Sequence, residues 1–440
     1  MSAACNQCQL GEPGEIRTAG TPAELDTVSR PVDRQSRPNY AVWEVTLKCD
    51  LRCTHCGSRA GKARPDELST DEAIDLIDQM ADLGVGEISL IGGEAYLRSD
   101  WLQLVTRCRE RDMLVQMTTG AWGLTHDRLV AARDAGLQSV SISVDGFEQV
   151  HDTLRGRKGS FAAVKRTFAD LRQLGGIRIT ANTQINRTNL GEIEPLFAWL
   201  IDEGIADWQV QLTAAMGRAA DEPGVLLQPY QVLQTHPMLV RCRRYGDARG
   251  VRLWPGNNIG YFGPFEHILR HDWSCQHRGS CAAGRSTLGI EANGNIKGCP
   301  SLPTDKFVGG NIRDHQLVDI WERSKALRFT RDISVKQLSG FCATCYYREN
   351  CYGGCHWTAS VLLGDIGNNP YCHHRAVELL ERGRRERVEL SVPAPGLPFD
   401  HAIYRIIEEE WPSDSHRQRA LEITRTAEGT LLEEELTLPH

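Results

Sequence analysis

Six short apolar segments alternate with amphipathic stretches along one part of the chain, and this alternation restricts the fold more than any other feature. The stretches between the segments carry helix signals; STDEAIDLIDQMADLG, for example, begins at an N-cap candidate, Ser69 or Thr70, and ends at Gly84. Strands that alternate with helices form parallel sheets through right-handed crossovers, with functional loops at the carboxyl ends of the strands. Six units are too few for a closed eightfold barrel, so the sequence predicts an α/β fold, an open partial (β/α)6 barrel with a lateral mouth for a large substrate. The segments are YAVWEVTL (40–47), GEISLIGG (86–93), MLVQMTTG (113–120), QSVSISVDG (138–146), IRITANTQI (177–185) and DWQVQLTA (207–214).

Charge and hydropathy argue against two broad classes of partner. The 440 residues include 57 acidic and 50 basic ones, a formal net charge of −7, which gives no electrostatic footprint for nucleic acid. The chain has no apolar run long enough to cross a membrane, and its first residues lack the basic and apolar regions of a signal peptide. We therefore expect a cytoplasmic protein with no nucleic-acid or membrane partner. In that reducing compartment, grouped cysteines are expected to be metal ligands or redox groups rather than disulfides.

The segment KCDLRCTHC places three thiols, Cys49, Cys53 and Cys56, in the loop after the first apolar segment. Structural zinc is almost always held by four protein ligands, and no matching pair of cysteines lies nearby. Three local thiols suit an iron-sulfur cube whose fourth iron is left open. The loop is therefore predicted to hold a [4Fe-4S] cluster with one iron free for another ligand.

These residues resemble the radical SAM enzymes. The spacing Cys49-x3-Cys53-x2-Cys56, with the aromatic His55 before the last cysteine, is similar to the cluster loop of that family, and GGE after the second segment matches a further family motif. The resemblance implies that S-adenosylmethionine chelates the open iron and that Gly92, Gly93 and Glu94 hold its methionine amine. Glycines let the backbone approach a ligand closely, and a carboxylate complements an ammonium. One departure is Asp50, where relatives often have Asn.

Polar residues at later strand ends are the other candidate cofactor contacts. The resemblance and the strand-end positions suggest ribose contacts for Ser143 and Asp145, a pocket wall at Thr118 or Thr119, a contact at Gln184, and an approach of Arg218, in MGRA (216–219), to the SAM carboxylate or the substrate. For each of them the alternative is a local hydrogen bond in a turn or at a strand end. No catalytic base is assigned by the sequence.

A second cysteine group resembles the SPASM domain of peptide- and protein-modifying radical SAM enzymes. Its pattern is Cys281-x12-Gly294-x4-Cys299, then Cys342-x2-Cys345-x5-Cys351-x3-Cys355, then Cys372, with Cys275 ahead of it. Eight thiolates can ligate two [4Fe-4S] clusters fully. The resemblance assigns the nearer auxiliary cluster to Cys275, Cys281, Cys299 and Cys355, and the distal one to Cys342, Cys345, Cys351 and Cys372. The alternative is two four-cysteine zinc sites.

The run TLGIEANGNIKGCPS (287–301) predicts a β-hairpin with a two-residue turn at Asn293-Gly294, which would deliver Cys299 from a short strand. Cys108 and Cys242 lie in helical stretches and are expected to be buried hydrophobes. Cys5 and Cys8 form an isolated CxxC, which is a weak metal motif.

The predicted organisation has five parts. These are a flexible N-terminal segment (1–38), the radical SAM partial barrel (39–215), a linker and bridging region (216–274), a small α+β SPASM domain (275–372) and a C-terminal helical extension (373–440), which serves as a docking element or as a cover for the barrel edge.

The resemblance implies a peptide maturase with three [4Fe-4S] clusters and S-adenosylmethionine as cofactors. Reductive cleavage of SAM would give a 5′-deoxyadenosyl radical that abstracts hydrogen from a residue of a ribosomally made precursor peptide, which leads to a cross-link or another oxidative modification. The expected partners are that peptide, a separate leader-recognition protein, and a flavodoxin- or ferredoxin-type reductant. The alternatives are a sulfatase-maturase-like enzyme, against which Pro300 counts because sulfatase maturases have Asp there, an enzyme of quinone-cofactor maturation, and a non-catalytic iron-sulfur electron-transfer or scaffold protein.

Overall fold

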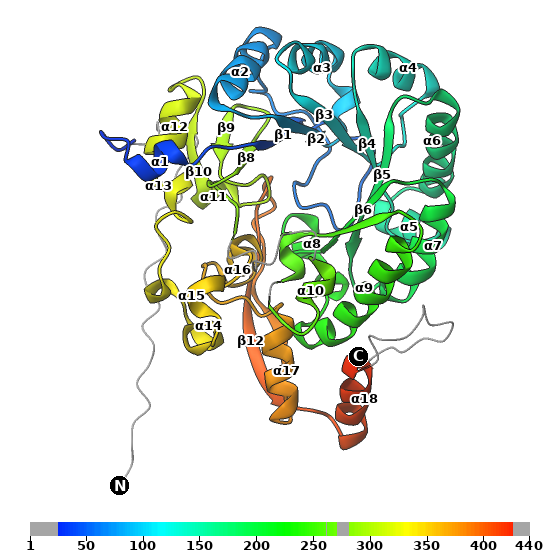
Figure 1. Ribbon diagram of the computed structural model, residues 1–440, viewed down its shortest axis with the longest axis vertical. Coiled ribbons are helices and arrows are strands. Elements are labelled where there is room, and N and C mark those ends of the chain that lie inside the picture. Colours follow the sequence, from blue (N-terminus) through cyan, green and yellow to red (C-terminus); the bar gives the residue numbers. More distant parts are fainter. Residues whose placement is uncertain (1–24, 261, 271–280, 426–440) are drawn as a thin grey trace.

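A curved parallel sheet with helices along its outer side forms the first part of the molecule (Figure 1). The structure is a computed structural model that describes residues 25–260, 262–270 and 281–425. Its first six strands are neighbours in chain order and pair in parallel. The predicted partial barrel is therefore confirmed. The strands are β1 (Tyr40–Thr46), β2 (Glu87–Gly92), β3 (Leu114–Thr119), β4 (Ser139–Ser143), β5 (Arg178–Ile185) and β6 (Asp207–Leu212).

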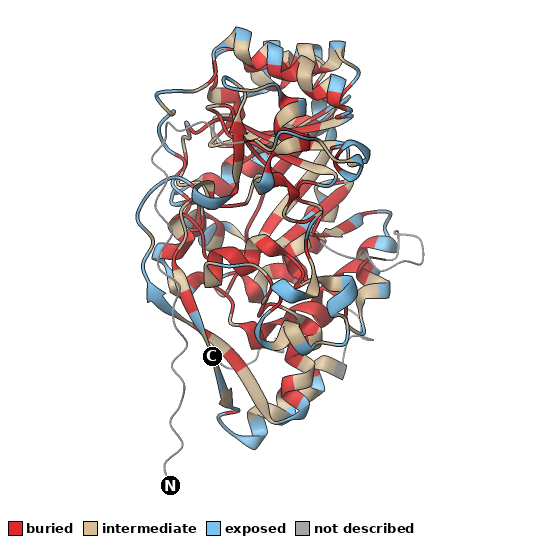
Figure 2. Cartoon of the chain, turned by 90° about the vertical axis from the view of Figure 1, so that its left-hand side faces the viewer, coloured by how far each residue is buried: buried red, intermediate tan, exposed pale blue. Residues whose placement is uncertain are grey.

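Amphipathic helices connect these strands and bury their apolar faces against the sheet. In α2, Ser69 Oγ accepts a hydrogen bond from the backbone N–H of Glu72 at the first turn, and Gly84 ends the helix with a left-handed φ of 103°. The buried residues Leu76 and Met80 of α2 belong to the same core as the sheet, and buried residues run through the middle of the molecule (Figure 2). The barrel helices are α2 (Thr70–Leu83), α3 (Trp101–Glu110), α4 (His126–Asp134), α5 (Glu148–Arg155), α6 (Ser160–Leu174), α7 (Ile193–Asp202) and α9 (Val232–Asp247).

The sheet continues beyond the six predicted strands at both edges. A seventh parallel strand, β7 (Arg252–Pro255), pairs with β6, and β8 (Thr287–Ile290) pairs in parallel with β1. Two antiparallel strands, β9 (Asn295–Lys297) and β10 (Val308–Asn311), follow β8 in a ten-stranded sheet. The cysteine-rich region is thus joined to the barrel through backbone hydrogen bonds.

The hairpin β8–β9 is present, but its turn differs from the prediction. The backbone N–H of Glu291 donates to the carbonyl of Asn295 (3.0 Å), and that of Gly294 donates to the carbonyl of Glu291 (2.9 Å). The loop therefore has three residues, 292–294, rather than two, and Gly294 takes the left-handed position with φ 87°. Both cysteines expected to be buried hydrophobes, Cys108 in α3 and Cys242 in α9, are fully buried.

The described parts of the segments expected to be loose or linking contain helices and a strand. Helix α1 (Pro31–Gln35) carries the fully buried Asp33, whose carboxylate lies 2.9 Å from Arg328 Nη2 and 3.1 Å from Arg331 Nη1. Residues 25–38 thus pack on the cysteine-rich region, where the sequence predicted a flexible segment. The bridging region contains the mostly buried α9 as well as β7. The candidate ligands Cys5, Cys8 and Cys275 lie outside the described residues.

The C-terminal extension is a helix, a hairpin and a second helix rather than helical throughout. The part of the extension before the hairpin forms the expected helix, α17 (His373–Glu381). Gly383, with φ 72°, ends this helix, and β11 (Arg384–Val392) then pairs antiparallel with β12 (Ile403–Glu410). Cross-strand ion pairs such as Arg385–Glu409 (2.7 Å) favour the hairpin. Helix α18 (Asp414–Arg425) follows.

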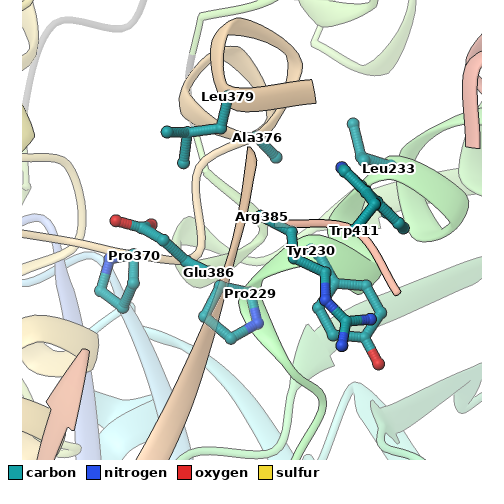
Figure 3. Close-up of a pocket in the computed structure, with 9 residues that line it drawn as sticks. All are labelled: Pro229, Tyr230, Leu233, Pro370, Ala376, Leu379, Arg385, Glu386 and Trp411. Atoms are coloured by element: carbon teal, nitrogen blue, oxygen red, sulfur yellow. The ribbon is translucent and has the colours of Figure 1, made fainter. Parts of the chain in front are cut away.

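The hairpin is attached to the bridging region through Arg385. Its guanidinium lies over the rings of Tyr230 and Trp411, at 4.7 and 5.5 Å from their centroids (Figure 3). The backbone N–H of Val388 also donates to Gln228 Oε1 (2.7 Å). Because these contacts are made along β11, the extension is held against the described part of the chain over much of its length.

Shorter elements complete the described chain. None of the described helices is both long enough and apolar enough to cross a bilayer. The short α-helices are α8 (Arg218–Asp221), α10 (Glu266–Leu269), α11 (Thr304–Phe307), α12 (Leu317–Arg323), α13 (Lys325–Arg328), α14 (Gly340–Thr344), α15 (Arg348–Cys351) and α16 (His356–Leu363), and the 3-10 helices are η1 (Ala95–Leu97), η2 (Leu190–Glu192), η3 (Pro223–Val225), η4 (Pro229–Gln231), η5 (Asn257–Ile259) and η6 (Val335–Gln337).

Candidate iron-sulfur active site

The three-thiol loop lies at the carboxyl edge of the sheet, directly after β1. Cys53 is buried, and Cys49 and Cys56 are partly buried. Burial raises the pKa of the Cys53 thiol to about 11, with the nearby Cys56 adding to this and Arg155 opposing it. Burial also raises the pKa of Cys49, and the charges of Glu94 and of the other two thiols add to the effect. Gathered, buried thiols of this kind need a cation to stabilise their thiolates, which an iron-sulfur cluster provides.

The GGE motif extends the pairing of β1 and β2 past the strand ends and brings its carboxylate to this loop. The N–H of Gly93 donates to the carbonyl of Thr46 and the N–H of Glu94 to that of Lys48, both at 2.9 Å. A Cβ on Gly92 would lie 2.2 Å from the Thr46 oxygen, and one on Gly93 would lie 2.2 Å from the Lys48 oxygen. Only glycine therefore fits at these two positions.

Glu94 is buried between the loops that follow β1 and β3. Its carboxylate accepts hydrogen bonds of 2.6 Å from Thr119 Oγ1 and from the N–H of Gly120. Burial raises the pKa of Glu94 to about 8, and the charge of Asp50 adds to this, while the two hydrogen bonds oppose it. Of the two threonines considered from the sequence, Thr119 is the one that contacts Glu94.

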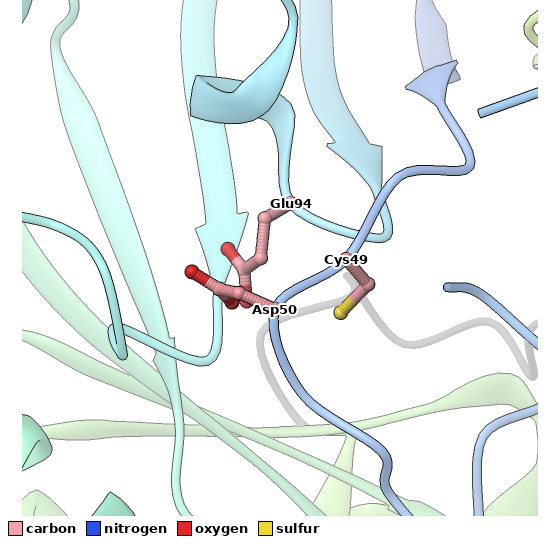
Figure 4. Close-up of side chains that lie close together, drawn as sticks. All are labelled: Cys49, Asp50 and Glu94. Atoms are coloured by element: carbon pink, nitrogen blue, oxygen red, sulfur yellow. The ribbon is translucent and has the colours of Figure 1, made fainter. Parts of the chain in front are cut away.

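One thiol and two carboxylates meet at this point. Ligand atoms of Cys49, Asp50 and Glu94 all lie within 4.8 Å of one another (Figure 4). Asp50 Oδ2 accepts a hydrogen bond from the Tyr96 hydroxyl (2.9 Å), so the acid that replaces the more frequent Asn has its own partner. Two carboxyl groups beside the cluster loop are suitable partners for an ammonium group.

Asp145 has partners that differ from the ribose contact suggested by the sequence. Its carboxylate is fully buried and lies 2.9 Å from His55 Nε2 and 2.6 Å from Arg155 Nη2, and it accepts a hydrogen bond from the N–H of Gln184 (2.9 Å). Burial alone would raise the pKa of Asp145, but Arg155 and His55 outweigh it and hold the pKa well below its usual range. The geometry favours an anchor for the cluster loop, in which His55 and Asp145 are positioning residues.

Arg155 was missed by the sequence reasoning. It ends α5, its side chain is almost fully buried, and Nη1 lies 3.8 Å from Cys53 Sγ. A fixed cation at this distance offsets the charge of a thiolate. Arg155 lies in LRGR, which has no motif spacing relative to the cysteines, so nothing in the sequence pointed to it.

Arg218 also contacts the cluster loop rather than a free pocket. Its Nε donates to the carbonyl of Cys53 (2.7 Å) and Nη1 donates to the carbonyl of Ala60 (3.0 Å). Gly217, with φ 58°, packs so tightly that a Cβ there would lie 2.3 Å from the Cys56 oxygen. The sequence suggested that Arg218 approaches the SAM carboxylate or the substrate, whereas the structure favours a role in holding the loop.

The face of the sheet opposite the helices is lined largely by polar side chains. Ser141 and Ser143 of β4 alternate with the core residues Val140 and Ile142. Asn182 joins them: its Nδ2 donates to Ser141 Oγ and its Oδ1 accepts from Ser143 Oγ, both at 3.1 Å. By the same alternation and pairing, this face also carries the polar residues Gln116, Thr118, Ser139, Thr180, Gln184, Gln209 and Gln211 and the charged residues Glu44, Glu87, Arg178, Asp207 and Arg252.

The C-terminal extension reaches the cluster loop as well. Asp400 Oδ1 lies 2.6 Å from Arg59 Nε, and the N–H of Gly217 donates to the Asp400 carbonyl (2.8 Å). Phe399 belongs to a small apolar cluster against which Cys49 and Cys56 pack. The extension, whose role the sequence left open between docking and cover, therefore clamps the loop through the segment between its two strands.

Seven of the eight SPASM cysteines are described, and their thiols fall into two groups. Each of Cys281, Cys299 and Cys355 has a pKa raised mainly by burial, and the charge of Cys355 raises those of Cys281 and Cys299 further. Burial also raises the pKa of Cys351, and the charges of Cys372, Cys342 and Cys345 raise it further. The interleaved partition that the resemblance implied stays a prediction.

The spread of these thiols argues against the zinc alternative. Four thiolates at about 2.3 Å from one zinc ion lie about 3.8 Å from each other. Among the described residues, only Cys49, Asp50 and Glu94 bring three potential ligand atoms within 4.8 Å of one another. No three of the described SPASM thiols are therefore gathered as closely as a single zinc ion needs.

Comparisons with known proteins agree with this geometry. The family model described as the radical SAM superfamily matches residues 43–200, and the model of an iron-sulfur cluster-binding domain, SPASM, matches residues 281–346. The mycofactocin maturase MftC of Mycolicibacterium smegmatis is 30% identical over 325 residues, which are 72% of this chain and 78% of the relative. The AdoMet-dependent heme synthase of Methanosarcina barkeri is 27% identical over 361 residues, 77% of this chain and 97% of the relative.

Two further relatives extend the comparison. The PqqA peptide cyclase of Methylocella silvestris is 28% identical over 340 residues, 75% of this chain and 86% of the relative. The crystal structure of Streptococcus suis SuiB bound to S-adenosylmethionine covers 77% of this chain and 76% of its own, with a TM-score of 0.59 and 17% identity. The likeness to SuiB is one of fold.

A partial barrel with a three-thiol loop at its carboxyl edge, joined to a domain with two further thiol groups, defines an iron-sulfur enzyme. The chain belongs to the radical SAM superfamily and carries a SPASM domain. S-adenosylmethionine and a [4Fe-4S] cluster are therefore its barrel cofactors, and auxiliary iron-sulfur clusters belong to the SPASM domain. The predicted family, fold and cofactors are confirmed.

Proposed function

We propose that this radical SAM enzyme is a peptide maturase that abstracts hydrogen from one residue of a ribosomally made precursor peptide. The similarity to the mycofactocin maturase, at 30% identity over 78% of that protein, carries the proposal, and the similarity to the PqqA peptide cyclase points to the same class of substrate. The product would be a cross-link or another oxidative modification of the peptide.

The polar face of the sheet supports a peptide substrate. Serine, threonine, asparagine and glutamine side chains both donate and accept hydrogen bonds, as backbone amides do. The cations at the amino end of this face are neutralised, because Arg178 and Arg252 both pair with Asp207, at 2.7 and 3.0 Å. A surface of such hydrogen-bonding groups orients a peptide without demanding charge from it.

In the proposed reaction, the barrel residues hold the cofactors and fix the reacting geometry. Cys49, Cys53 and Cys56 would ligate the barrel cluster, and Glu94 with the backbone of Gly92 and Gly93 would hold the SAM amine. The cofactors, when bound, supply one-electron reduction of the sulfonium and a carbon-centred radical. The contribution of the chain is to position one C–H bond beside that radical and to exclude water, which is where rate is gained from orientation.

The auxiliary-cluster ligands and the remaining contacts complete the proposal. Cys281, Cys299 and Cys355, with Cys275, would hold one cluster, and Cys342, Cys345, Cys351 and Cys372 the other. Ser143, Thr118 and Gln184 lie on or beside the polar face, where they could contact the nucleoside or the peptide. His55, Asp145 and Arg218 would hold the cluster loop in place.

A second candidate function is tetrapyrrole chemistry of the heme-synthase type, because this chain covers 97% of that relative. Haem carries two carboxylate groups, so a site for such a substrate needs unpaired arginines or lysines. The polar face described above instead carries the carboxylates of Glu44 and Glu87, and its arginines Arg178 and Arg252 are already paired with Asp207. This difference ranks tetrapyrrole chemistry second.

The experiment uses anaerobically reconstituted protein with dithionite and SAM. Formation of 5′-deoxyadenosine, followed by a mass change in a short peptide encoded beside the gene, is the expected result. Cleavage of SAM that leaves such peptides unchanged but converts an iron coproporphyrin would favour the second candidate. No cleavage by fully loaded protein would instead indicate a non-catalytic scaffold.

We also propose three features of the cellular setting. A separate protein recognises the leader of the precursor, a flavodoxin- or ferredoxin-type protein supplies electrons, and the enzyme works in the cytoplasm, where a reducing thiol pool protects free cysteines. A pull-down with the precursor peptide from anaerobic lysate tests the first of these: recovery of no second protein, together with tight binding of the peptide by the enzyme alone, would contradict it.

A further inference from the structure

Five exposed basic side chains lie on the cluster loop, in the turn between α5 and α6, and on α6. None of the five makes an ion pair with a carboxylate in the part of the chain that the structure describes. Elsewhere exposed arginines are commonly paired, as in Arg37–Glu322 (2.8 Å) and Arg382–Glu378 (2.7 Å). These five residues, called the basic surface below, are Arg52, Arg157, Lys158, Lys165 and Arg166.

The basic surface is built directly onto the cluster ligands. Arg52 precedes Cys53 in the chain, and its N–H donates to the carbonyl of Arg155 (3.3 Å). Arg157 Nη1 donates to the carbonyl of Asp50 (2.8 Å), the residue after Cys49. A Cβ on Gly156 would lie 2.3 Å from the Arg52 oxygen, so the α5–α6 turn is pressed against the loop. A molecule seated on this surface is separated from the thiols by little more than the loop itself.

The surface is also held in shape. The guanidinium of Arg157 lies 4.0 Å from the ring centroid of Trp122, and Arg166 Nη2 donates to the Trp122 carbonyl (3.4 Å). The neighbouring acid, Asp152, accepts hydrogen bonds from the N–H groups of Gly159 and Phe161, at 2.6 and 2.8 Å. Its carboxylate is thereby held by backbone N–H groups at the start of α6.

We propose that the basic surface is the docking site of an acidic one-electron donor protein of the flavodoxin class. The inference rests on the proposed function, because the barrel cluster must receive an electron for each SAM cleaved. The reduced flavin loses one electron and the cluster gains one, so the exchange needs no other reactant. With a net charge of −7, the chain as a whole repels an acidic partner, and a local positive surface orients that partner toward the cluster loop.

Other anionic occupants fit the position less well. A precursor peptide must bring its reacting residue to the inner side of the loop, where Glu94 lies, whereas the five cations are exposed. A nucleic acid bound here would gain nothing from the nearby cluster. Unpaired positive charge beside the cluster ligands therefore favours an electron donor over a peptide or a nucleic acid at this position.

The test uses cluster-loaded enzyme and an acidic bacterial flavodoxin as the probe. The variant Lys158→Glu/Arg166→Glu changes the surface charge by four units, and Arg382→Glu/Arg419→Glu, around α17 and α18 (Figure 1), makes the same change far from the loop. Calorimetry with oxidised flavodoxin measures binding, and stopped-flow bleaching with photoreduced flavodoxin measures electron transfer. At low salt, we expect Lys158→Glu/Arg166→Glu to lower both the affinity for flavodoxin and the second-order rate of bleaching at least about tenfold, and we expect the difference from wild type to shrink as the salt concentration rises. The control variant should behave as wild type.

Equal losses in both variants, or none in either, would overturn the docking proposal. If the reversal does not fold, Lys158→Gln/Arg166→Gln is expected to give a smaller loss of the same kind. Dithionite needs no docking site, so dithionite-driven formation of 5′-deoxyadenosine should be unchanged in all variants. Absence of that product in wild type would refute the proposed function instead, and the two failures are thus distinguishable.

Discussion

Replacing Asp145 by asparagine tests whether this carboxylate anchors the cluster loop or contacts the ribose of SAM. The carboxylate lies 2.6 Å from Arg155 and 2.9 Å from His55 in a fully buried setting, and breaking a buried ion pair costs about 3–5 kcal/mol. Asparagine keeps an oxygen for the N–H of Gln184, so we expect the lower end, about 3 kcal/mol. That is a large part of the usual stability of a domain, about 5–15 kcal/mol.

The assay combines urea unfolding, iron content and SAM binding. We expect Asp145→Asn to shift the unfolding midpoint downward and to lose about four irons per chain after desalting. The control is Thr235→Ala, in α9, which removes the hydrogen bond to the carbonyl of Gln231 (3.0 Å) and should cost about 1 kcal/mol without loss of iron. A variant that keeps its iron and its stability but binds SAM tenfold more weakly would refute the anchor and restore the ribose contact.

The pH dependence of this effect follows from the direction of the shift. Arg155 and His55 hold the pKa of Asp145 below its usual range despite burial. A depressed carboxyl pKa stabilises the fold above the unfolded pKa of about 3.9, and the contribution is lost as the pH falls toward the folded value. The difference between wild type and Asp145→Asn should therefore be constant between about pH 6 and pH 8.

Three further predictions concern the SPASM ligands, the C-terminal clamp and a buried acid. If Cys355 shares a cluster with Cys281, the double variant Cys281→Ser/Cys355→Ser should lose about four irons, whereas Cys351→Ser/Cys355→Ser should lose about eight; equal losses would contradict the interleaved partition. Asp400→Asn, which breaks a 2.6 Å ion pair with the cluster loop, should speed loss of the barrel cluster to a chelator and leave the auxiliary clusters intact, as selective EPR titration would reveal. Burial raises the pKa of Glu44 to about 7. Between the unfolded pKa and pH 7 the folded state therefore binds an extra proton, and the free energy of unfolding falls as the pH rises. In urea unfolding, Glu44→Gln should make this fall with pH smaller, and an unchanged pH dependence would show that another group titrates.

Much of the fold and part of the site followed from local sequence. The six strands could be predicted because a buried parallel strand requires a continuous apolar run and a covering helix requires a 3.6-residue period. The Gly92-Gly93 pair was readable because only glycine tolerates backbone oxygens 2.2 Å from a Cβ position. Strand β7 was not predicted, because RLWP is short and carries a charge and a proline. Strands β11 and β12 were predicted as part of a helical extension, because alternating charges suit an exposed helix and a paired hairpin equally well.

The sequence by itself determined which thiols are present, how they are spaced, and that a glutamate follows two glycines at a strand end, since these are local properties of the chain. The tertiary structure alone decided what surrounds them. Asp145, Arg155, Arg218 and Asp400 lie far from the cysteines in the chain, yet all four contact the cluster loop or a residue of it. Whether a charged side chain binds a cofactor or anchors a loop depends on which opposite charges and carbonyls surround it after folding, and no spacing along the chain encodes those neighbours.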